Sequence, residues 1–211
     1  MKHIVLMADI VGSREHHSKE LMSHFKTLVE ETNGTFKDAI SSPLTITLGD
    51  EFQAVAKSAA VATQIILFFE ESLIHKQLNF KLRYVINEGN IDTMINTARA
   101  YEMLGEGLTE ARELLGKLKE GDSRFFVSLA DKNVSTILNE SFTIYQSIIE
   151  EWKVEKDYEI VSSFLTFKDY KKISAILKRN RSLIWKRERS LHLKSYYAIK
   201  KIIELSVKPT S

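Results

Sequence analysis

The protein has 211 residues and a mass of 24.2 kDa, with 44% hydrophobic and 27% charged residues, which is the composition of a globular protein rather than a disordered one. The absence of cysteine excludes disulfides, thiolate metal sites and cysteine nucleophiles. The longest apolar runs, such as residues 65–69, are too short to span a bilayer. The apolar run at the N-terminus meets Asp9 too soon for a signal peptide, so we expect a cytoplasmic protein with no membrane partner.

Charge is divided unevenly along the chain, although the net charge is only +2. Residues 1–167 carry 17 Lys and Arg against 25 Asp and Glu, a net charge of −8. Residues 168–201 carry 12 basic against 2 acidic residues, a net charge of +10. This asymmetry indicates an acidic body with a basic attachment that meets a polyanion such as nucleic acid. The alternative is a solvated pair of basic helices.

The first 130 residues are predicted to form an α+β domain with helices packed on one face of a sheet. Hydrophobic periodicity and turn residues predict strands at 3–11, 44–48, 52–55, 78–87 and 124–129, and helices at 16–31, 58–75 and 106–118. Thr32, Asn33 and Gly34 are expected to end the first helix. Residues 49–51 are expected to form a hairpin turn, and residues 87–90 a second turn.

The remainder of the chain is predicted to be helical. Helices are expected at 133–152, 156–165, 168–178 and 181–205. We therefore expect an α+β domain over residues 1–130, a connector helix over 131–152 and an all-helical domain over 153–211.

Two acidic positions in the first domain suggest a metal and phosphate site. Asp9 emerges from a buried strand, where a carboxylate is costly unless it is paired or bound to metal. Gly12 and Ser13 follow, and a glycine turn with a hydroxyl near a helix N-terminus suits phosphate. If the first strand lies between the hairpin strands, Asp9 and Asp50 converge, and Mg²⁺ prefers such oxygen ligands. Alternatively, Asp9 caps the next helix and the hairpin is an ordinary acidic turn.

Residues 4–130 resemble class III nucleotide cyclases. The resemblance is carried by the run from Asp9 to Ser13 and by Gly49-Asp50 about forty residues later. Residues 49–52, Gly-Asp-Glu-Phe, also match four letters of the GGDEF motif of diguanylate cyclases. Residues 82–89 and 101–105 resemble the cyclase strand that ends in a His-x-Gly turn and the segment that carries a base-reading acid, which places Glu102 at that position.

The resemblance implies a ferredoxin-like palm domain in which Asp9 and Asp50 hold Mg²⁺. It implies nucleotide or phosphate contacts from the following residues: Ile10, Gly12, Ser13, Gly49, Glu51 and Glu102. Three positions depart from the cyclase pattern. Ile46 stands where cyclases have a base-reading lysine, and Thr109 stands where they have an asparagine. Glu113 stands where they have the transition-state arginine, and Arg112 is one place away. Without an arginine aimed at the developing charge, cyclisation loses a large electrostatic contribution.

The basic C-terminal segment has the layout of a helix-turn-helix. An amphipathic helix and a strongly basic second helix are separated by a short break at residues 178–180, and Asn180 is a natural N-cap for the second one. The residues expected to face DNA are Lys171, Lys172, Asn180, Arg181, Ser182, Trp185, Lys186 and Arg189. Lys178 stands where such a turn usually has glycine. The alternative is a basic helical hairpin that packs on the acidic body.

The combination of a cyclase-like domain, a bridging helix that ends in Trp152 and a C-terminal helix-turn-helix resembles the SatD family of bacteria. The resemblance implies a regulator-type protein, which we expect to act in transcription as a homodimer that binds DNA and a nucleotide or phosphate ligand with Mg²⁺. Two alternatives stay open: an active nucleotidyl-transfer or cyclase-type enzyme, and a protein-interaction module that uses the basic C-terminal face.

Overall fold

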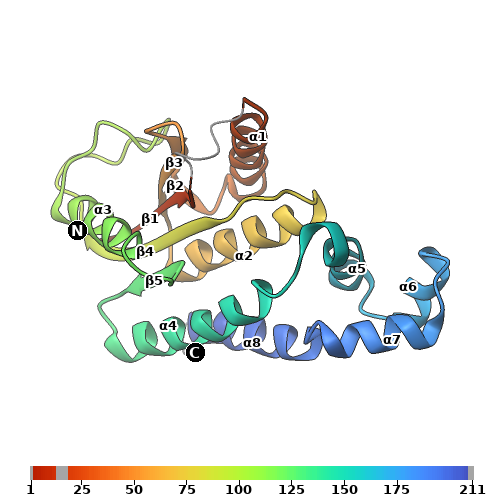
Figure 1. The fold of residues 1–211 in the computed structure, drawn as a ribbon. Helices are drawn as coiled ribbons and strands as arrows, with labels where there is room; N and C mark the ends of the chain where they lie inside the picture. Colours follow the sequence, from red (N-terminus) through yellow and green to blue (C-terminus); the bar gives the residue numbers. More distant parts are fainter. Residues whose placement is uncertain (1, 13–18, 209–211) are drawn as a thin grey trace.

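The computed structural model describes residues 2–12 and 19–208, and its first part is built on a five-stranded sheet (Figure 1). The strand order is β2-β3-β1-β4-β5, with β4 and β5 parallel and the other neighbours antiparallel. The strands are β1 (Lys2–Ile10), β2 (Ile40–Ile46), β3 (Glu51–Ala56), β4 (Leu82–Asn90) and β5 (Phe125–Ser128). With its helices this order is the ferredoxin-like β-α-β-β-α-β arrangement followed by a further strand. The predicted α+β class is confirmed.

Within the described ranges, three helices connect the strands and five more follow the sheet. Those within the sheet domain are α1 (Lys19–Phe36), α2 (Ala59–His75) and α3 (Glu106–Leu118). The later helices are α4 (Lys132–Ile149), α5 (Val154–Phe167), α6 (Tyr170–Ile176), α7 (Arg181–Ser190) and α8 (Leu193–Ser206). No helix in the described part of the chain has both the length and the hydropathy needed to cross a membrane.

Helices cover both faces of the sheet, so the prediction of a single covered face was wrong. Leu6 and Ala8 of β1 face the main core beneath α1 and α2, whereas Val5 and Met7 face a second apolar cluster beneath α3. Successive strand residues point to opposite faces, and the run of β1 from Ile4 to Ala8 is apolar throughout. Both faces of β1 therefore have to be covered.

Several helices and strands begin or end at other residues than predicted, because of tertiary contacts. The first helix runs past its expected end to Phe36, because the side chain of Asn33 bonds both the N–H and the carbonyl of Leu44, at 2.8 Å each, instead of ending the helix. β4 begins at Leu82 rather than 78 and continues through the expected turn to Asn90, which pairs with Lys2 of β1. β1 itself lies between β3 and β4 and not between the hairpin strands β2 and β3.

The start of α3 rests directly on the backbone of β4. A Cβ atom on Gly107 would lie 2.6 Å from the carbonyl carbon of Gly89, and one on Gly89 would lie 2.3 Å from the Cα of Gly107. Asn87 donates from Nδ2 to the Gly107 carbonyl at 3.0 Å. Because any larger residue would clash at either position, the Gly89–Gly107 contact sets the distance between α3 and the sheet.

A buried arginine joins the sheet to the helices on the other face. Arg124, 5% exposed, donates to both carboxylate oxygens of Glu70 in α2 at 2.9 and 3.0 Å, to the Leu82 carbonyl at 2.7 Å and to Glu150 at 3.1 Å. Burial, followed by the charge of Glu70, raises the pKa of the nearby phenol Tyr84 well above its usual value. Tyr84 therefore stays neutral beside the pair.

The C-terminal helices share the main core with the sheet. α4 packs on β5 and along α8, and α8 also contacts α2. The prediction of one helix over residues 181–205 was wrong. The chain forms two helices there, α7 and α8, and between them His192 adopts a left-handed φ of 52°. The buried Leu191 in this break accepts a hydrogen bond from Nε1 of Trp152 at 3.0 Å. Trp152 lies beyond the end of α4 rather than within it.

We predict that Gly107→Ala destabilises the protein and that Gly116→Ala, in the same helix, does not. The methyl group at residue 107 would overlap the β4 backbone, which should cost about 1–3 kcal/mol. A Cβ on Gly116 meets nothing within 4 Å, and alanine there should add about 0.5–1 kcal/mol of helix stability. Urea unfolding of both variants measures these changes. Equal effects at both positions would contradict a close approach at Gly107.

We further predict that Arg124→Met and Glu70→Leu each lower the free energy of unfolding by about 3–5 kcal/mol, since each leaves a buried partner unsatisfied. The double variant Arg124→Met/Glu70→Leu should lose less than the sum of the two single changes. The exposed pair Lys76–Glu31, 2.8 Å apart, is the control, and its removal should cost at most about 1 kcal/mol. Additive losses at Arg124 and Glu70 would show that the pair is not coupled.

Candidate functional site

Two buried carboxylates lie side by side on the face of the sheet that α3 covers. Asp9 and Glu51 are direct register partners across β1 and β3, and opposite residues in an antiparallel pair share one face. They are 3% and 5% exposed, respectively. The sequence indicated Asp50 as the partner of Asp9, whereas the register places Glu51 opposite it.

Cations of the same chain contact both carboxylates. Nζ of Lys119, at the C-terminal end of α3, lies 2.8 Å from Oδ2 of Asp9. Arg83 of β4, the other register partner of Asp9, approaches Oδ1 at 3.7 Å. Glu51 accepts from Arg112 of α3 at 3.2 Å and from the hydroxyl of Thr47 at 3.1 Å. The negative charge of the two acids is therefore compensated by cations from α3 and β4.

The glycine turns expected to hold phosphate lie next to this pair. Gly12 and Gly49 both have positive φ, 68° and 85°, and half-buried Asp50 lies in the turn before β3. The N–H of Ile10 donates to the Asp50 carbonyl at 3.0 Å, so the two segments predicted to converge are joined through the backbone. Ser13, the expected hydroxyl donor, lies outside the residues that the structure describes.

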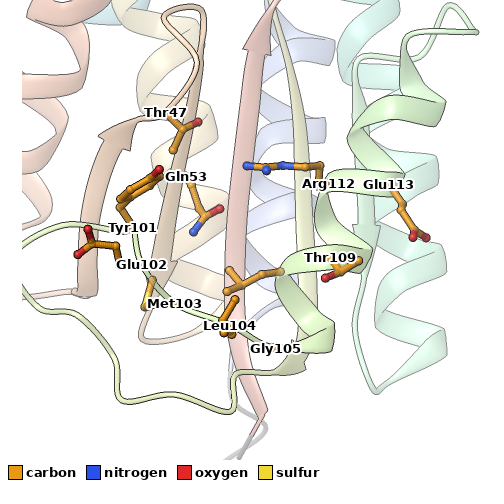
Figure 2. Close-up of a pocket in the computed structure, with 11 residues that line it drawn as sticks. Thr47, Gln53, Tyr101, Glu102, Met103, Leu104, Gly105, Thr109, Arg112 and Glu113 are labelled. Atoms are coloured by element: carbon orange, nitrogen blue, oxygen red, sulfur yellow. The ribbon is translucent and has the colours of Figure 1, made fainter.

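A cavity of about 430 Å³ opens beside the acidic pair (Figure 2). Residues 101–105 form one wall, Gln53 of β3 with Thr47 just after β2 another, and α3 a third. Figure 2 shows Arg112 extending from α3 toward Thr47 and Gln53. Arg112 and Thr47, which line the cavity, both contact Glu51, so the cavity lies one side chain away from the acidic pair.

Four of the residues that line this cavity stand at, or next to, positions of cyclase site residues: Glu102, Thr109, Arg112 and Glu113. Glu102 adopts a left-handed φ of 58° and pairs with Arg99 at 2.9 Å. In Figure 2 its carboxylate points away from Gln53, and Glu113 points to the side of α3 opposite Arg112. Ile46, at the position of the cyclase base-reading lysine, packs against the main core instead.

The sequence indicated the segment that connects β4 to α3 only through Glu102, and it did not indicate that this segment forms a wall of the cavity. This segment is tied to the sheet by hydrogen bonds from the Ala100 N–H to Thr45, at 2.7 Å, and from Gln53 to the Ala100 carbonyl, at 3.1 Å. It places Tyr101 and Leu104 over the sheet. The available signal in the sequence was Gln53, a polar residue within the fully buried strand β3.

The cyclase resemblance implies a divalent cation, and the oxygen atoms around Asp9 show how far such an ion fits here. Oδ1 of Asp9 is buried and has no hydrogen-bond partner among the described residues, and a hard carboxylate oxygen suits Mg²⁺. Within residues 2–12 and 19–208, no three His, Asp or Glu side chains gather closely enough to hold a metal. Asp9 therefore fits as one ligand, and the remainder of a coordination shell would come from Asp50, water or phosphate.

The second candidate surface is the pair α6 and α7, at the end of the molecule remote from α3 (Figure 1). Asn180 caps α7 as expected, accepting the Ser182 N–H at 2.8 Å. Lys178, in place of a turn glycine, has the left-handed φ of 50°. The residues expected to contact DNA are all exposed: Lys171, Lys172, Asn180, Arg181, Ser182, Trp185, Lys186 and Arg189.

Other basic residues of this segment hold the helices in place. Arg187 pairs with Asp157 of α5, a buried carboxylate that also accepts the Lys153 N–H at 2.9 Å. Arg179 pairs with Glu159 of α5. The hairpin thus uses two of its arginines on the acidic helix α5 and leaves the row of candidate DNA contacts exposed.

Comparisons with known proteins identify both a family and a set of similar folds. The sequence model of the SatD family matches residues 3–205. No curated protein matches the chain. The solved structures that resemble it include a bacterial light-regulated adenylyl cyclase, with a TM-score of 0.43 and 13% identity over 60% of this chain and 74% of that one. The guanylate cyclase domain of RhGC from Catenaria anguillulae has a TM-score of 0.35 and 16% identity over 55% and 72%.

Proposed function

The chain belongs to the SatD family, and from this premise and the geometry of the site we propose that it is a regulator that binds a nucleotide beside Asp9 and Glu51. The observation that carries the proposal is the cavity of about 430 Å³ whose lining residue Arg112 bonds Glu51 of a buried acidic pair that cations contact. Its size lies in the range of small-molecule sites.

The lining of the cavity suits a nucleobase. Tyr101, Met103, Leu104 and Leu108 offer apolar surface against which a planar ring could stack. Thr109 adds a hydroxyl group to the lining, and Thr47 and Gln53, which donate to Glu51 and to the Ala100 carbonyl, keep acceptor oxygens that a base edge could bond. The same lining contains Glu102 and Glu113, so the cavity favours the uncharged part of a ligand, with its phosphates toward Arg112 and the sheet edge.

The phosphates would lie near the ends of β1 and β3. Arg112, Arg83 and Lys119 supply positive charge there, and the Gly12 turn opens beside them. Mg²⁺ held by Asp9 and Asp50 would neutralise phosphate charge. The N–H of Val11 is bonded to the Lys81 carbonyl at 2.9 Å, so backbone contacts to phosphate would come from Gly12 onward.

We propose binding without turnover. Glu113 is an acid at the position of the cyclase transition-state arginine. Arg112, one position away, faces the phosphates but shares its charge with Glu51, so among the described lining residues no arginine is free of a carboxylate to stabilise charge that develops in a transition state. The competing function is a nucleotidyl-transfer or cyclase-type enzyme with unfamiliar catalytic groups. It is favoured by the presence of Arg112 in the cavity, one position from the expected arginine.

The second part of the proposal is DNA binding by α6 and α7. The specific observation is the exposed row of basic residues beside Trp185, in a segment of net charge +10. The acidic body, with its net charge of −8, would repel DNA and leave these helices as the contact. One short helix buries too little surface for specific affinity, so we propose that a homodimer binds. The alternative is a protein-interaction module on the same face.

We predict that the purified protein binds ATP or GTP in a calorimetric titration with Mg²⁺. Tyr101→Ala should weaken binding roughly tenfold, because base stacking on an aromatic ring contributes about 1–3 kcal/mol. The control is Met94→Ala, in the same segment, where the side chain is 92% exposed and outside the cavity. Absence of nucleotide binding would exclude the sensor and the enzyme alike. Product formation abolished by Asp9→Asn would favour the enzyme.

We predict that the full-length protein binds genomic DNA fragments with an affinity that falls steeply as salt rises, since phosphate contacts release counterions. Arg181→Ala with Lys186→Ala should remove sequence preference, while Lys171→Ala with Lys172→Ala should weaken binding to all sequences alike. Lys26→Ala, an exposed lysine of α1, is the control. Fluorescence anisotropy at several salt concentrations measures this. If no salt-dependent binding is detected, the basic face has to be assigned to a protein partner.

A further inference from the structure

Two cations of α3 and its C-terminal cap reach the two buried acids from one side of the helix. Arg112 and Lys119 are seven residues apart, which is about two helical turns, so both project from the same face. Arg112 bonds Glu51 and Lys119 bonds Asp9, and these acids are register partners in the sheet. This face of α3 therefore neutralises the acidic pair at two points.

The two oxygens of Asp9 have different surroundings. Oδ2 is held by the ammonium of Lys119 at 2.8 Å. Oδ1 has no hydrogen-bond partner in the part of the chain that the structure describes, and Arg83 remains 3.7 Å away. A buried carboxylate with one unsatisfied oxygen is costly, and a second hard cation would relieve that cost.

The bond from Lys119 is easier to release than the contact from Arg83. The side chain of Lys119 is 50% exposed, whereas that of Arg83 is 16% exposed and that of Asp9 only 4%. Lys119 stands at the end of α3 on a flexible stem, so its ammonium can move into solvent without disturbing the helix. Arg83 is held within β4 and has no such route.

We propose that Lys119 is a tethered cation that occupies Asp9 until a divalent ion binds and then gives up the carboxylate to the ion. This inference rests on the proposed function of the site. An ammonium at 2.8 Å from Oδ2 competes with the ion for the same charge and repels it. Lys119 thus lowers the affinity for the ion and keeps the empty site stable.

The exchange also links the ion to the cavity. Lys119 and Arg112 belong to one helical segment, and Arg112 lines the cavity while it contacts Glu51. Release of Lys119 removes one of the two points at which α3 is tied to the acidic pair. Lys119 is therefore a positioning residue, because its bond to Asp9 ties the end of α3 to the acidic pair only while no ion is bound.

The test is binding of Mn²⁺ alone, followed through the electron paramagnetic resonance signal of the free ion. Lys119→Met should raise the affinity for Mn²⁺ about tenfold because the competing charge is gone. Lys119→Arg, which keeps the charge, should stay near the original affinity. Lys117→Met, at another exposed lysine of α3, is the matched control and should change nothing.

A second measurement separates this role from a purely structural one. Without divalent ions, Lys119→Met should melt at a lower temperature than the parent protein, and Mg²⁺ should restore more of the melting temperature in the variant than in the parent. Unchanged or lower Mn²⁺ affinity in Lys119→Met, or no Mn²⁺ binding by any variant, would overturn the proposal. Nucleotide titration of the same variants keeps the outcome apart from a failure of the proposed function.

Discussion

The fold depends on the bonds that Arg124 makes inside the core. Its guanidinium holds both oxygens of Glu70 in α2, the Leu82 carbonyl at the start of β4 and Glu150 at the end of α4. A planar, always charged group with five donors can satisfy so many acceptors in one buried place. By joining the sheet to α2 and α4, it sets the surface on which the C-terminal helices pack.

The two candidate functional surfaces lie at opposite ends of the molecule and are held in place by different contacts. The acidic pair and the cavity lie beneath α3, whose approach is set by the Gly89–Gly107 contact. The basic hairpin lies at the other end, where Arg187 and Asp157 hold α7 on α5 (Figure 1). Since α8 packs on both α4 and α2, one continuous core connects the sheet to the hairpin.

Of the acidic pair, residue types in the sequence singled out Asp9 as a metal ligand, and that role stays a prediction. A carboxylate at the end of an apolar strand indicated Asp9, and the structure places it, buried, beside cations. What no local pattern contained was its partner. Asp50 and Glu51 are adjacent in the sequence, and only the β1–β3 register puts Glu51 opposite Asp9. Lys119 and Arg112 lie far along the chain from the acids they contact, so no spacing rule could have paired them.

The sequence by itself determined the order of helices and strands, the extent of α3 and the Asn180 cap of α7, because periodicity and caps are properties of neighbouring residues. Only the tertiary structure decided that helices cover both faces of the sheet, that the last helix breaks at His192 and that residues 101–105 wall a cavity. These features follow from which distant segments pack together, and long-range packing overrides local preference wherever apolar surface has to be buried.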